Sequence, residues 1–501
     1  MVNRPVEKVR GMLDLLPEQR QAQQAVGAAL EAHLAAYGYR LVELPVLEQT
    51  ELYLRKVGQE MAGKLYAFRH HNRDLCLRPE LTASVMRAYV AYYQNASLPL
   101  RLGYHGPVFR YEAPGRGRYR QFTELGVELI GAGAPAADAE VIHLAAAGLE
   151  RLGLRDYQVV IGHIGIAQAF LAGLALDQRV RDWLTWSMED LRRHDAEQLH
   201  HALSALLPAA NGAGPALDEA LAAAGAAAGW EGLPPDEAER VVLRVLRSAG
   251  FDLSGSRRTP EEIARRLVGK LARRQSNADV ERALAFLRRL ARLRGAPAVV
   301  LADLRALLAE ERLPDAAVGQ VEALLDGLAA YGLPPARITL DAGLGRGLHF
   351  YTGIIFEIYD GAGVDQLAGG GRYDDLASVL GARERTPACG FAYGLERVVE
   401  ALTVRGLAPA ASAVAPEVLV CAVSAAESAY AIQVAQALRA EGRRVELDVR
   451  GRGVRANLEA ANRRGIPYVA IVGEAERRAG AYVWRDMAAQ AQECRRLKTE
   501  D

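Results

Sequence analysis

The spacing of apolar and polar positions predicts that the first 164 residues mix helices with antiparallel strands. Apolar side chains recur at helical spacing in some segments and at every second position in others, and turn-forming residues separate them. Pro45 lies inside one strand-like segment, where it indicates a strand edge or a break. The predicted elements are a helix at 17–37, a strand from Tyr39 to Val46, a hairpin at 63–78 with HHNR as its turn, a helix at 78–93, two strands around a turn from Leu100 to Gly131, and a helix from Ala137 to Leu152.

The pattern changes at residue 165. Residues 165–335 are amphipathic runs rich in Ala, Leu and Arg, with a looser Gly- and Pro-containing stretch from Asn211 to Pro235, so a mostly helical insertion is expected. Strand character returns at 336–343 and 348–360. The segments GGGRYDDLASVLG and CGFAYGLERVVEAL are each predicted to be a glycine turn that leads into a helix.

An Ala-, Pro- and Ser-rich linker, GLAPAASAVAP, marks a domain boundary near residue 410. Beyond it, strand-like and helix-like segments alternate, which predicts a small, mainly parallel α/β domain over residues 416–501. The predicted organisation is therefore one domain in two parts, residues 1–164 and 336–408, interrupted by the insertion at 165–335 and followed by the small domain.

Composition narrows the function classes. The formal net charge of the 501 residues is zero, so binding to nucleic acid would depend on a local basic patch. The four cysteines (Cys76, Cys389, Cys421 and Cys494) form no CxxC pair, which argues against a disulfide framework or a Cys-ligated zinc, and no metal-ligand set is predicted. No segment approaches the roughly 20 apolar residues that span a bilayer, and the N-terminus has no signal-peptide pattern, so a cytoplasmic protein is expected.

The predicted hairpin around residues 109–128 carries the most informative chemistry. Successive strand side chains point to opposite faces, so residue parity sorts them. One face combines arginines, carboxylates and an aromatic ring, which suits a nucleotide: arginines for phosphate oxygens and Phe122 for the base. The alternative is a solvated outer face of an antiparallel sheet. The nucleotide face comprises Arg110, Glu112, Arg118, Arg120, Phe122, Glu124 and Glu128, and the expected core face comprises Phe109, Tyr111, Tyr119, Gln121, Thr123, Leu125 and Val127.

Three other segments add candidate ligand contacts. Glu80 in LRPELT follows a predicted strand at the start of a helix, where a carboxylate can face a ligand amine, although Pro-Glu is also an ordinary helix start. Arg346 in GLGRGLHFYTG is flanked by glycines that would let the backbone approach a phosphate, or that simply form a turn. Arg397 lies three residues after Gly394 on a predicted helix, where it is either a ligand contact or a surface arginine.

Five segments in order resemble the histidyl-tRNA synthetase family: RGMLDLLP, RPELT, FRYE…GRYRQF, RGLHFYTG and GGGRYD…GFAYGLER. The resemblance covers nearly the whole chain apart from the insertion. It implies a mixed α/β fold in which an antiparallel class II catalytic sheet precedes an anticodon-binding α/β domain. It also implies a homodimer, with Pro45 in the first class II motif, and an enzyme that uses ATP and Mg²⁺ to join histidine to histidine tRNA.

The resemblance also implies residue roles. Arg110, Arg346 and Arg397 would be the catalytic arginines that neutralise charge during adenylate formation. The ATP site would comprise Arg110, Glu112, Arg118, Arg120, Phe122 and Arg397. The histidine site would comprise Glu80, Thr82, Glu124, Glu128, Arg346, Tyr351 and Tyr373. In the last domain Arg450, Arg452 and Arg455 form a local basic edge that could hold an RNA backbone, or alternatively a solvated helix start.

Two observations favour a second reading. Leu81, Glu124, His349 and Phe350 replace the glycine, glutamine and Asp-Tyr pair that are usual in the synthetases. Residues 157–174 and the helical stretch after them resemble a paralogue, the regulatory subunit of ATP phosphoribosyltransferase, which binds histidine and controls a catalytic subunit without charging tRNA. The presence of the C-terminal domain and of Arg110, Arg346 and Arg397 favours the synthetase over the regulatory subunit. A non-catalytic RNA-binding mimic is a third possibility, but it would leave the arginines without a role.

Overall fold

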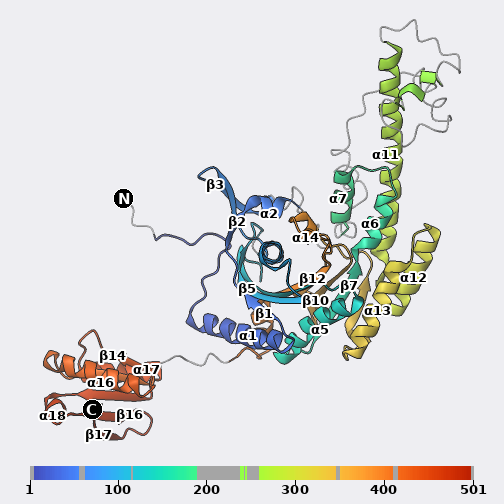
Figure 1. Cartoon of the computed structure of the whole chain (residues 1–501). Coiled ribbons are helices and arrows are strands. Elements are labelled where there is room, and N and C mark those ends of the chain that lie inside the picture. The colour runs from blue at the N-terminus through green and yellow to red at the C-terminus, as the bar shows by residue number, and fades with distance from the viewer. Residues whose placement is uncertain are drawn as a thin grey trace. The chain divides into compact units, whose positions relative to one another are not determined.

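The computed structural model forms two compact units, Met1–Pro409 and Ala410–Asp501 (Figure 1). It describes residues 5–55, 63–113, 115, 117–188, 237, 239–241, 243–244, 259–345, 350–409 and 416–497. None of the helices in these ranges is both long and apolar enough to cross a lipid bilayer.

A nine-stranded sheet organises the first unit. Its order is β1-β5-β6-β12-β11-β10-β7-β9-β8. The six strands from β5 to β7 pair antiparallel, whereas β1 is parallel to β5 and β9 is parallel to β7. The strands are β1 (Arg40–Val42), β5 (Leu100–Phe109), β6 (Gln121–Ile130), β12 (Ala388–Gly394), β11 (Gln366–Arg372), β10 (Ile354–Asp360), β7 (Tyr157–His163), β9 (Ile338–Asp341) and β8 (Arg294–Gly295).

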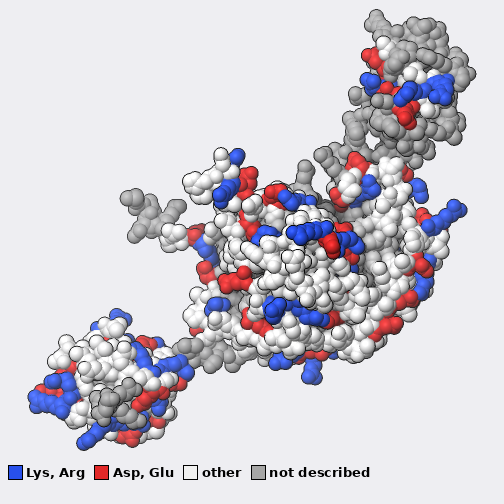
Figure 2. Space-filling model, viewed as in Figure 1, with Lys and Arg blue, Asp and Glu red and all other residues white. Residues whose placement is uncertain are grey.

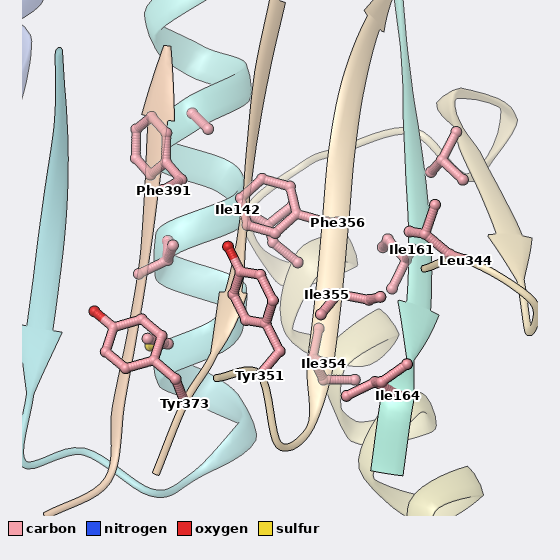
Figure 3. Packing of buried hydrophobic residues seen from close by; sticks show 14 of the residues in the cluster. Ile142, Ile161, Ile164, Leu344, Tyr351, Ile354, Ile355, Phe356, Tyr373 and Phe391 are labelled. Atoms are coloured by element: carbon pink, nitrogen blue, oxygen red, sulfur yellow. The ribbon is translucent and has the colours of Figure 1, made fainter. Parts of the chain in front are cut away.

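Helices α1 (Pro17–Ala36), α5 (Pro135–Arg151) and α15 (Leu395–Val404) pack against this sheet and against one another. Their apolar residues join those of the strands in one large core. Within that core Ile355 and Phe356 of β10 lie between Ile161 of β7 and Phe391 of β12 (Figure 3). The predicted helices at 17–37 and 137–152 and the strand pair from Leu100 to Gly131 are confirmed.

A small sheet of order β2-β4-β3 accompanies the large one. His71 and Asn72 both have positive φ, 43° and 61°, as a tight turn between two antiparallel strands requires, so the predicted hairpin is confirmed. The elements of this region are β2 (Leu47–Gln49), α2 (Thr50–Leu54), β3 (Tyr66–His70), β4 (Arg73–Leu77), α4 (Thr82–Ala88) and the π-helix η1 (Tyr89–Tyr93).

The predicted strand from Tyr39 to Val46 is too long. Only β1 forms, and it ends before Pro45. The side chain of Arg78 donates hydrogen bonds to the carbonyl oxygens of Leu44 and Pro45, at 2.6 and 3.2 Å. The backbone at residues 44 and 45 is therefore held by the Arg78 side chain and not by pairing with a neighbouring strand.

The described part of residues 165–335 is mostly helical. Helix α13 packs along α5, and β8 pairs with β9 at the edge of the large sheet, so this part is attached to the first unit. The looser stretch from Asn211 to Pro235 lies outside the described residues. The elements are α6 (Ile164–Ala172), α7 (Gln178–Trp186), α11 (Pro260–Arg292), α12 (Pro297–Glu310), α13 (Ala316–Ala330) and the 3-10 helix η3 (Pro335–Arg337).

Two predicted glycine turns are wrong. GGGR lies in β11 and CGFAYG forms β12, and only afterwards do α14 (Leu376–Val379) and α15 begin. These glycines are needed because the strands approach closely. A Cβ atom on Gly370 would lie 2.0 Å from the carbonyl oxygen of Gly390, and one on Gly371 would lie 2.6 Å from that of Ile354.

The second unit is a five-stranded α/β domain of order β14-β13-β15-β16-β17. The first three strands are parallel, as predicted, but two antiparallel strands that the sequence pattern did not reveal extend the sheet. Its elements are β13 (Val418–Ala422), the 3-10 helix η4 (Ala425–Glu427), α16 (Ser428–Ala440), β14 (Val445–Leu447), α17 (Val454–Arg464), β15 (Tyr468–Val472), α18 (Glu474–Arg478), β16 (Ala481–Asp486) and β17 (Gln492–Arg496).

Candidate active site

A pocket opens beside the β5–β6 hairpin, between the hairpin, β11, β12 and the start of α15. Its empty space, which includes open solvent at the mouth, is about 690 Å³. Six of the residues predicted from the sequence line it: Arg110, Glu112, Arg118, Phe122, Glu124 and Arg397. Residues far apart in the sequence therefore meet in one place.

Arginines concentrate positive charge in this pocket. Arg397 lies in the first turn of α15, and its guanidinium donates hydrogen bonds to the carbonyl oxygens of Gly117 (3.1 Å) and Gln366 (3.0 Å). The pKa of Arg397 is lowered, first by burial and next by the positive charges of Arg118 and Arg110. The repulsion between these positive charges would be relieved by a bound polyanion such as a nucleotide phosphate chain.

Arg110 is held from three sides. Its Nε donates to the carbonyl oxygen of Pro79 at 2.7 Å, and one Nη donates to Glu124 at 2.9 Å. The guanidinium carbon lies 5.2 Å from the centre of the Phe122 ring. Arginine, carboxylate and aromatic ring thus share one face of the hairpin, as parity predicted, and this face is not the solvated surface of the alternative reading.

Arg120 lies elsewhere. It does not line the pocket but stacks 4.0 Å from the ring centre of Tyr111 and donates to the carbonyl oxygens of Glu112 and Arg10. The predicted core face is right for Leu125 and Val127, which are fully buried, but wrong for Tyr111 and Gln121, which are exposed. Tyr111 lies past the end of β5 and Gln121 begins β6, so the hairpin tip extends beyond the packed part of the sheet.

A second group of candidates consists of buried carboxylates next to the pocket. Glu80 precedes α4, and its carboxylate accepts the backbone N–H of Ala83 at 3.1 Å. Burial first, and then the negative charge of Glu124, raise the pKa of Glu80 to about 7. In such surroundings the ionised form of a carboxylate is stabilised most when a cation binds beside it.

Glu128 is completely buried in β6, where it accepts hydrogen bonds from the hydroxyls of Tyr104 (3.2 Å) and Tyr373. Burial is the main reason that the pKa of Glu128 is raised to about 8, and the Thr82 and tyrosine hydroxyls oppose that rise. A Cβ atom on Gly390 would lie 1.8 Å from the Glu128 carboxylate, so glycine in β12 provides its space. The group is therefore poised between its neutral and charged forms near neutral pH.

Tyr373 donates a hydrogen bond to this carboxylate, and Tyr351 lies beside Tyr373 (Figure 3). Their ring centres are 6.4 Å apart, and the buried ring of Phe350 packs on both, at 4.8 and 5.5 Å. Phe350, one of the unusual residues, thus supports the two tyrosines. Arg346 and His349 lie outside the described residues.

The other departures also have a place in the structure. Leu81 is 2% exposed and belongs to the main core, and its φ of −105° does not require glycine. Its backbone N–H donates to Glu124 at 3.2 Å. Glu124 is 7% exposed and bridges Leu81 to Arg110. The replacement of glutamine by glutamate therefore adds a charge at a buried position directly beside an arginine of the pocket.

Three site residues were missed from the sequence. Tyr104 bonds Glu128, Gln366 lines the pocket and holds Arg397, and Glu396 lines the pocket and accepts the backbone N–H of Thr123 at 3.0 Å. Tyr104 could have been found, because in an antiparallel register it falls on the face of β5 that carries Glu128 on β6. Gln366 acts through its carbonyl oxygen, which leaves no sequence signal.

The three arginines predicted to contact RNA, Arg450, Arg452 and Arg455, surround the start of α17. Asp448 accepts the backbone N–H groups of Arg450 (3.2 Å) and Arg452 (2.7 Å), and it also pairs with the Arg452 side chain at 3.1 Å. Arg455 pairs with Glu459 and its side chain is 94% exposed. On the face shown in Figure 2, positive and negative side chains are interspersed.

Comparison with known proteins now decides the family. The histidyl-tRNA synthetase family model matches residues 11–233 and 237–398, and a model of the anticodon-binding domain matches residues 417–500. The chain belongs to the histidyl-tRNA synthetase family. The mixed α/β architecture is that of a class II synthetase core with a C-terminal anticodon-binding domain, as the sequence predicted.

Relatives in this family match along nearly their whole length. The histidine–tRNA ligase of Methanocaldococcus jannaschii is 30% identical over 96% of this chain and 95% of its own. That of Thermococcus kodakarensis is 31% identical over 96% and 94%. The apo histidyl-tRNA synthetase of S. aureus has the same fold, with a TM-score of 0.60, 22% identity and 98% of each chain covered.

The fold is also similar to that of a Bacillus halodurans protein described as an ATP phosphoribosyltransferase regulatory subunit/histidyl-tRNA synthetase. The TM-score is 0.59 and the identity 23%, over 94% of this chain and 99% of that one. At this identity the likeness shows the fold alone. The anticodon-binding domain matched over residues 417–500 favours the tRNA-charging branch of the histidyl-tRNA synthetase family.

Proposed function

We propose that this protein is a histidine–tRNA ligase that activates histidine with ATP and transfers the histidyl group to histidine tRNA. The observation that carries the proposal is the meeting of Arg110, Arg118 and Arg397 with Phe122 in one pocket. Glu124 connects this pocket to the buried carboxylates, because it lines the pocket and raises the pKa of Glu80. An anion site and a cation site therefore adjoin, as the joining of ATP to an amino acid requires.

The proposed chemistry is attack of the histidine carboxylate on the α-phosphorus of ATP. A new C–O–P linkage forms, the bond to the β-phosphate breaks, and pyrophosphate leaves. Two anions must approach, so arginines that neutralise both supply most of the rate enhancement, and no protein nucleophile is needed. Arg110 and Arg397 take the phosphates in this proposal, and Arg346 is assigned to the α-phosphate and the carboxylate by family resemblance alone.

The remaining roles are proposed from the family resemblance. Phe122 and Glu112 are assigned to the adenine, and Arg118 to the pyrophosphate end. Arg120, assigned to that end by resemblance, would have to leave Tyr111 to reach it. For histidine, Glu80, Thr82 and Glu124 are assigned to the ammonium, and the assignment for the imidazole is Glu128, Tyr351 and Tyr373.

Mg²⁺ is proposed to arrive with the nucleotide. Among the described residues no group of three His, Cys, Asp or Glu side chains could hold a metal ion by itself. That suits a cation bound mainly by phosphate oxygens and one or two carboxylates, such as Glu112 or Glu396 at the pocket wall. When bound, it would neutralise phosphate charge.

Two partners complete the proposal. Histidine tRNA would contact the second unit through Arg450, Arg452 and Arg455, and a second copy of the chain would pair through the motif that contains Pro45. Both assignments rest on family resemblance together with the exposed positions of Arg450 and Arg455.

Histidine-dependent exchange of labelled pyrophosphate into ATP tests adenylate formation. The purified protein is expected to catalyse exchange only when histidine is present. Absence of exchange, together with histidine-dependent binding to a phosphoribosyltransferase catalytic subunit, would instead establish the regulatory function.

Changing both Arg450 and Arg455 to alanine is expected to weaken the binding of tRNA without affecting the formation of histidyl-adenylate. Loss of two phosphate contacts should raise KM for tRNA about tenfold at low salt and by a smaller factor at high salt, because the variant has the shallower salt dependence. The measurement is tRNA charging at several salt concentrations, with pyrophosphate exchange as the internal control. An unchanged KM for tRNA would show that Arg450 and Arg455 do not contribute to tRNA binding.

A further inference from the structure

A buried aspartate lies at the basic edge of the second unit. The side chain of Asp448, directly after β14, is only 2% exposed, and its backbone N–H donates to the carbonyl oxygen of Val420 at 2.8 Å. Its two carboxylate oxygens accept four hydrogen bonds. The donors are the backbone N–H groups of Arg450 (3.2 Å) and Arg452 (2.7 Å), the Nε of Arg452 (3.1 Å) and the Nδ2 of Asn457 (2.9 Å).

These hydrogen bonds join the loop of residues 449–453 to helix α17. Asn457 is fully buried in α17, and its Nδ2 also donates to the carbonyl oxygen of Arg452 at 2.9 Å. The loop contains two glycines, and Gly451 has a positive φ of 63°. A five-residue segment of that composition has many alternative conformations, and restricting them costs conformational entropy. The Asp448 carboxylate therefore holds the loop and the start of the helix in one arrangement before any ligand binds.

The pKa of Asp448 agrees with this role. Burial by itself would raise that pKa, but the hydrogen bonds from Asn457 and from the backbone N–H groups of Arg450 and Arg452 outweigh burial, and the pKa is lowered. The carboxyl group is consequently ionised at neutral pH. Hydrogen bonds to an ionised acceptor are stronger than those to a neutral one, so the loop is held firmly.

This carboxylate has two opposite effects on RNA binding. Its negative charge weakens the attraction of the basic edge for phosphate groups. In contrast, a loop that is already ordered loses less conformational entropy when RNA binds. Arg450 is exposed in the loop and the Arg455 side chain is 94% exposed on α17, so the loop and the helix that Asp448 connects set their positions. The two effects predict opposite results when the charge is removed.

We propose that Asp448 is a positioning residue for tRNA: it orders the loop of residues 449–453 against α17, so that Arg450 and Arg455 meet the RNA backbone with little further ordering. The inference rests on the proposed function and deepens it. Arg452 belongs to the frame of this loop, since its backbone N–H and its Nε both donate to Asp448. Ordering outweighs repulsion, because salt screens a charge near the surface whereas the hydrogen bonds are buried.

The first test measures the Kd for histidine tRNA by filter binding, which does not require catalysis. Asp448→Asn removes the charge and turns an amide group toward donors that need an acceptor. It should raise the Kd about tenfold, although a negative charge has been removed. Glu459→Gln is the matched control, because Glu459 pairs with Arg455 at 3.0 Å and its replacement removes the same charge without touching the loop. It should leave the Kd unchanged or lower it by up to about threefold.

A second pair of variants changes the loop without changing its charge. Gly451→Ser places an L-residue at a φ of 63°, in the left-handed region that serine disfavours, and should raise the Kd about fivefold. Gly453→Ser is its control, because Gly453 has a φ of −61° and precedes α17, where serine is favoured. It should keep the Kd within about twofold of the wild type. A Cβ atom on either glycine would lie more than 4 Å from the other described atoms, its chain neighbours aside.

A Kd for Asp448→Asn at or below the wild-type value would overturn the proposal, as would equal Kd values for Gly451→Ser and Gly453→Ser. The glycine pair decides the matter even if Asp448→Asn does not fold, because both glycines are exposed. A wild type that does not bind histidine tRNA would overturn it as well. Histidine-dependent pyrophosphate exchange should be unchanged in the variants. Its absence from the wild type would mark failure of the proposed function, whereas the inference alone fails if the wild type exchanges pyrophosphate and binds tRNA but the variants do not differ as expected.

Discussion

The variant Arg397→Ala is expected to lower kcat/KM for histidine-dependent pyrophosphate exchange about a thousandfold. The guanidinium of Arg397 projects from the first turn of α15 into the pocket, fixed by two carbonyl oxygens that have no charge of their own to neutralise it. Its positive charge is consequently available to a phosphate. In a partly buried site such a charge acts far more strongly than it would in water.

Arg405→Ala is the matched control for that experiment. Arg405 follows the same helix and pairs with Asp360 at 3.3 Å, away from the pocket. This variant should keep the exchange rate within about threefold, because loss of a partly exposed ion pair affects stability by only about 1 kcal/mol. A loss of less than tenfold in Arg397→Ala, or an equal loss in both variants, would contradict the assignment of Arg397.

The second large effect is expected from Glu128→Gln. Glu128 is proposed to recognise the imidazole, with the hydroxyls of Tyr104 and Tyr373 fixing its carboxylate. An amide of the same shape cannot carry the charge that would pair with an imidazolium, so KM for histidine should rise about a hundredfold, while KM for ATP changes little. Steady-state exchange at varied histidine and ATP separates the two constants. An equal rise in both KM values would show that Glu128 maintains the structure of the site and does not recognise the imidazole.

The same variant has a second readout in the stability of the ligand-free protein. The folded protein raises the pKa of Glu128 from 4.5 to about 8, so folding favours the protonated carboxyl. The stabilisation this gives is complete below pH 4.5 and is lost progressively until the pH passes about 8. Within that window one such group lowers the free energy of unfolding by about 1.4 kcal/mol per pH unit.

Glutamine does not titrate, so Glu128→Gln should lack this slope. The free energy of unfolding of the wild type relative to the variant should fall from pH 5 to about pH 8 and then become constant. Glu80, with its pKa raised to about 7, contributes a slope of the same sign in both proteins, and its negative charge also raises the pKa of Glu128, so the difference measures Glu128 together with its coupling to Glu80. Denaturant titrations from pH 5 to 9 give these values. A difference that does not depend on pH would contradict the buried, protonated state of Glu128.

Parity along one hairpin predicted much of the site. Arg110, Phe122 and Glu124 face one pocket because the alternation of strand side chains is a local property. Arg120 has the same parity and lies opposite Arg110 across the hairpin, but its side chain stacks on Tyr111 and does not line the pocket. Parity therefore predicted the face of the hairpin but not the contact that each side chain makes.

The remaining failures are tertiary in origin. Gly370 and Gly371 belong to a strand because neighbouring strands pass too close for side chains, and a run of glycines alone reads as a turn. Gln366 enters the site through a main-chain oxygen, which composition does not encode. The extra strands β16 and β17 have short, mixed sequences whose pairing depends on β15.

Charging of histidine tRNA by the purified protein is the decisive measurement of the proposed ligase activity. Transcribed histidine tRNA is incubated with ATP, Mg²⁺ and labelled histidine, and acid-precipitable label is followed over time, with a tRNA for another amino acid as the control. Labelling is expected to depend on histidine and on ATP, and to occur on histidine tRNA alone. No labelling by a folded protein that still binds histidine would contradict it and would favour the regulatory function.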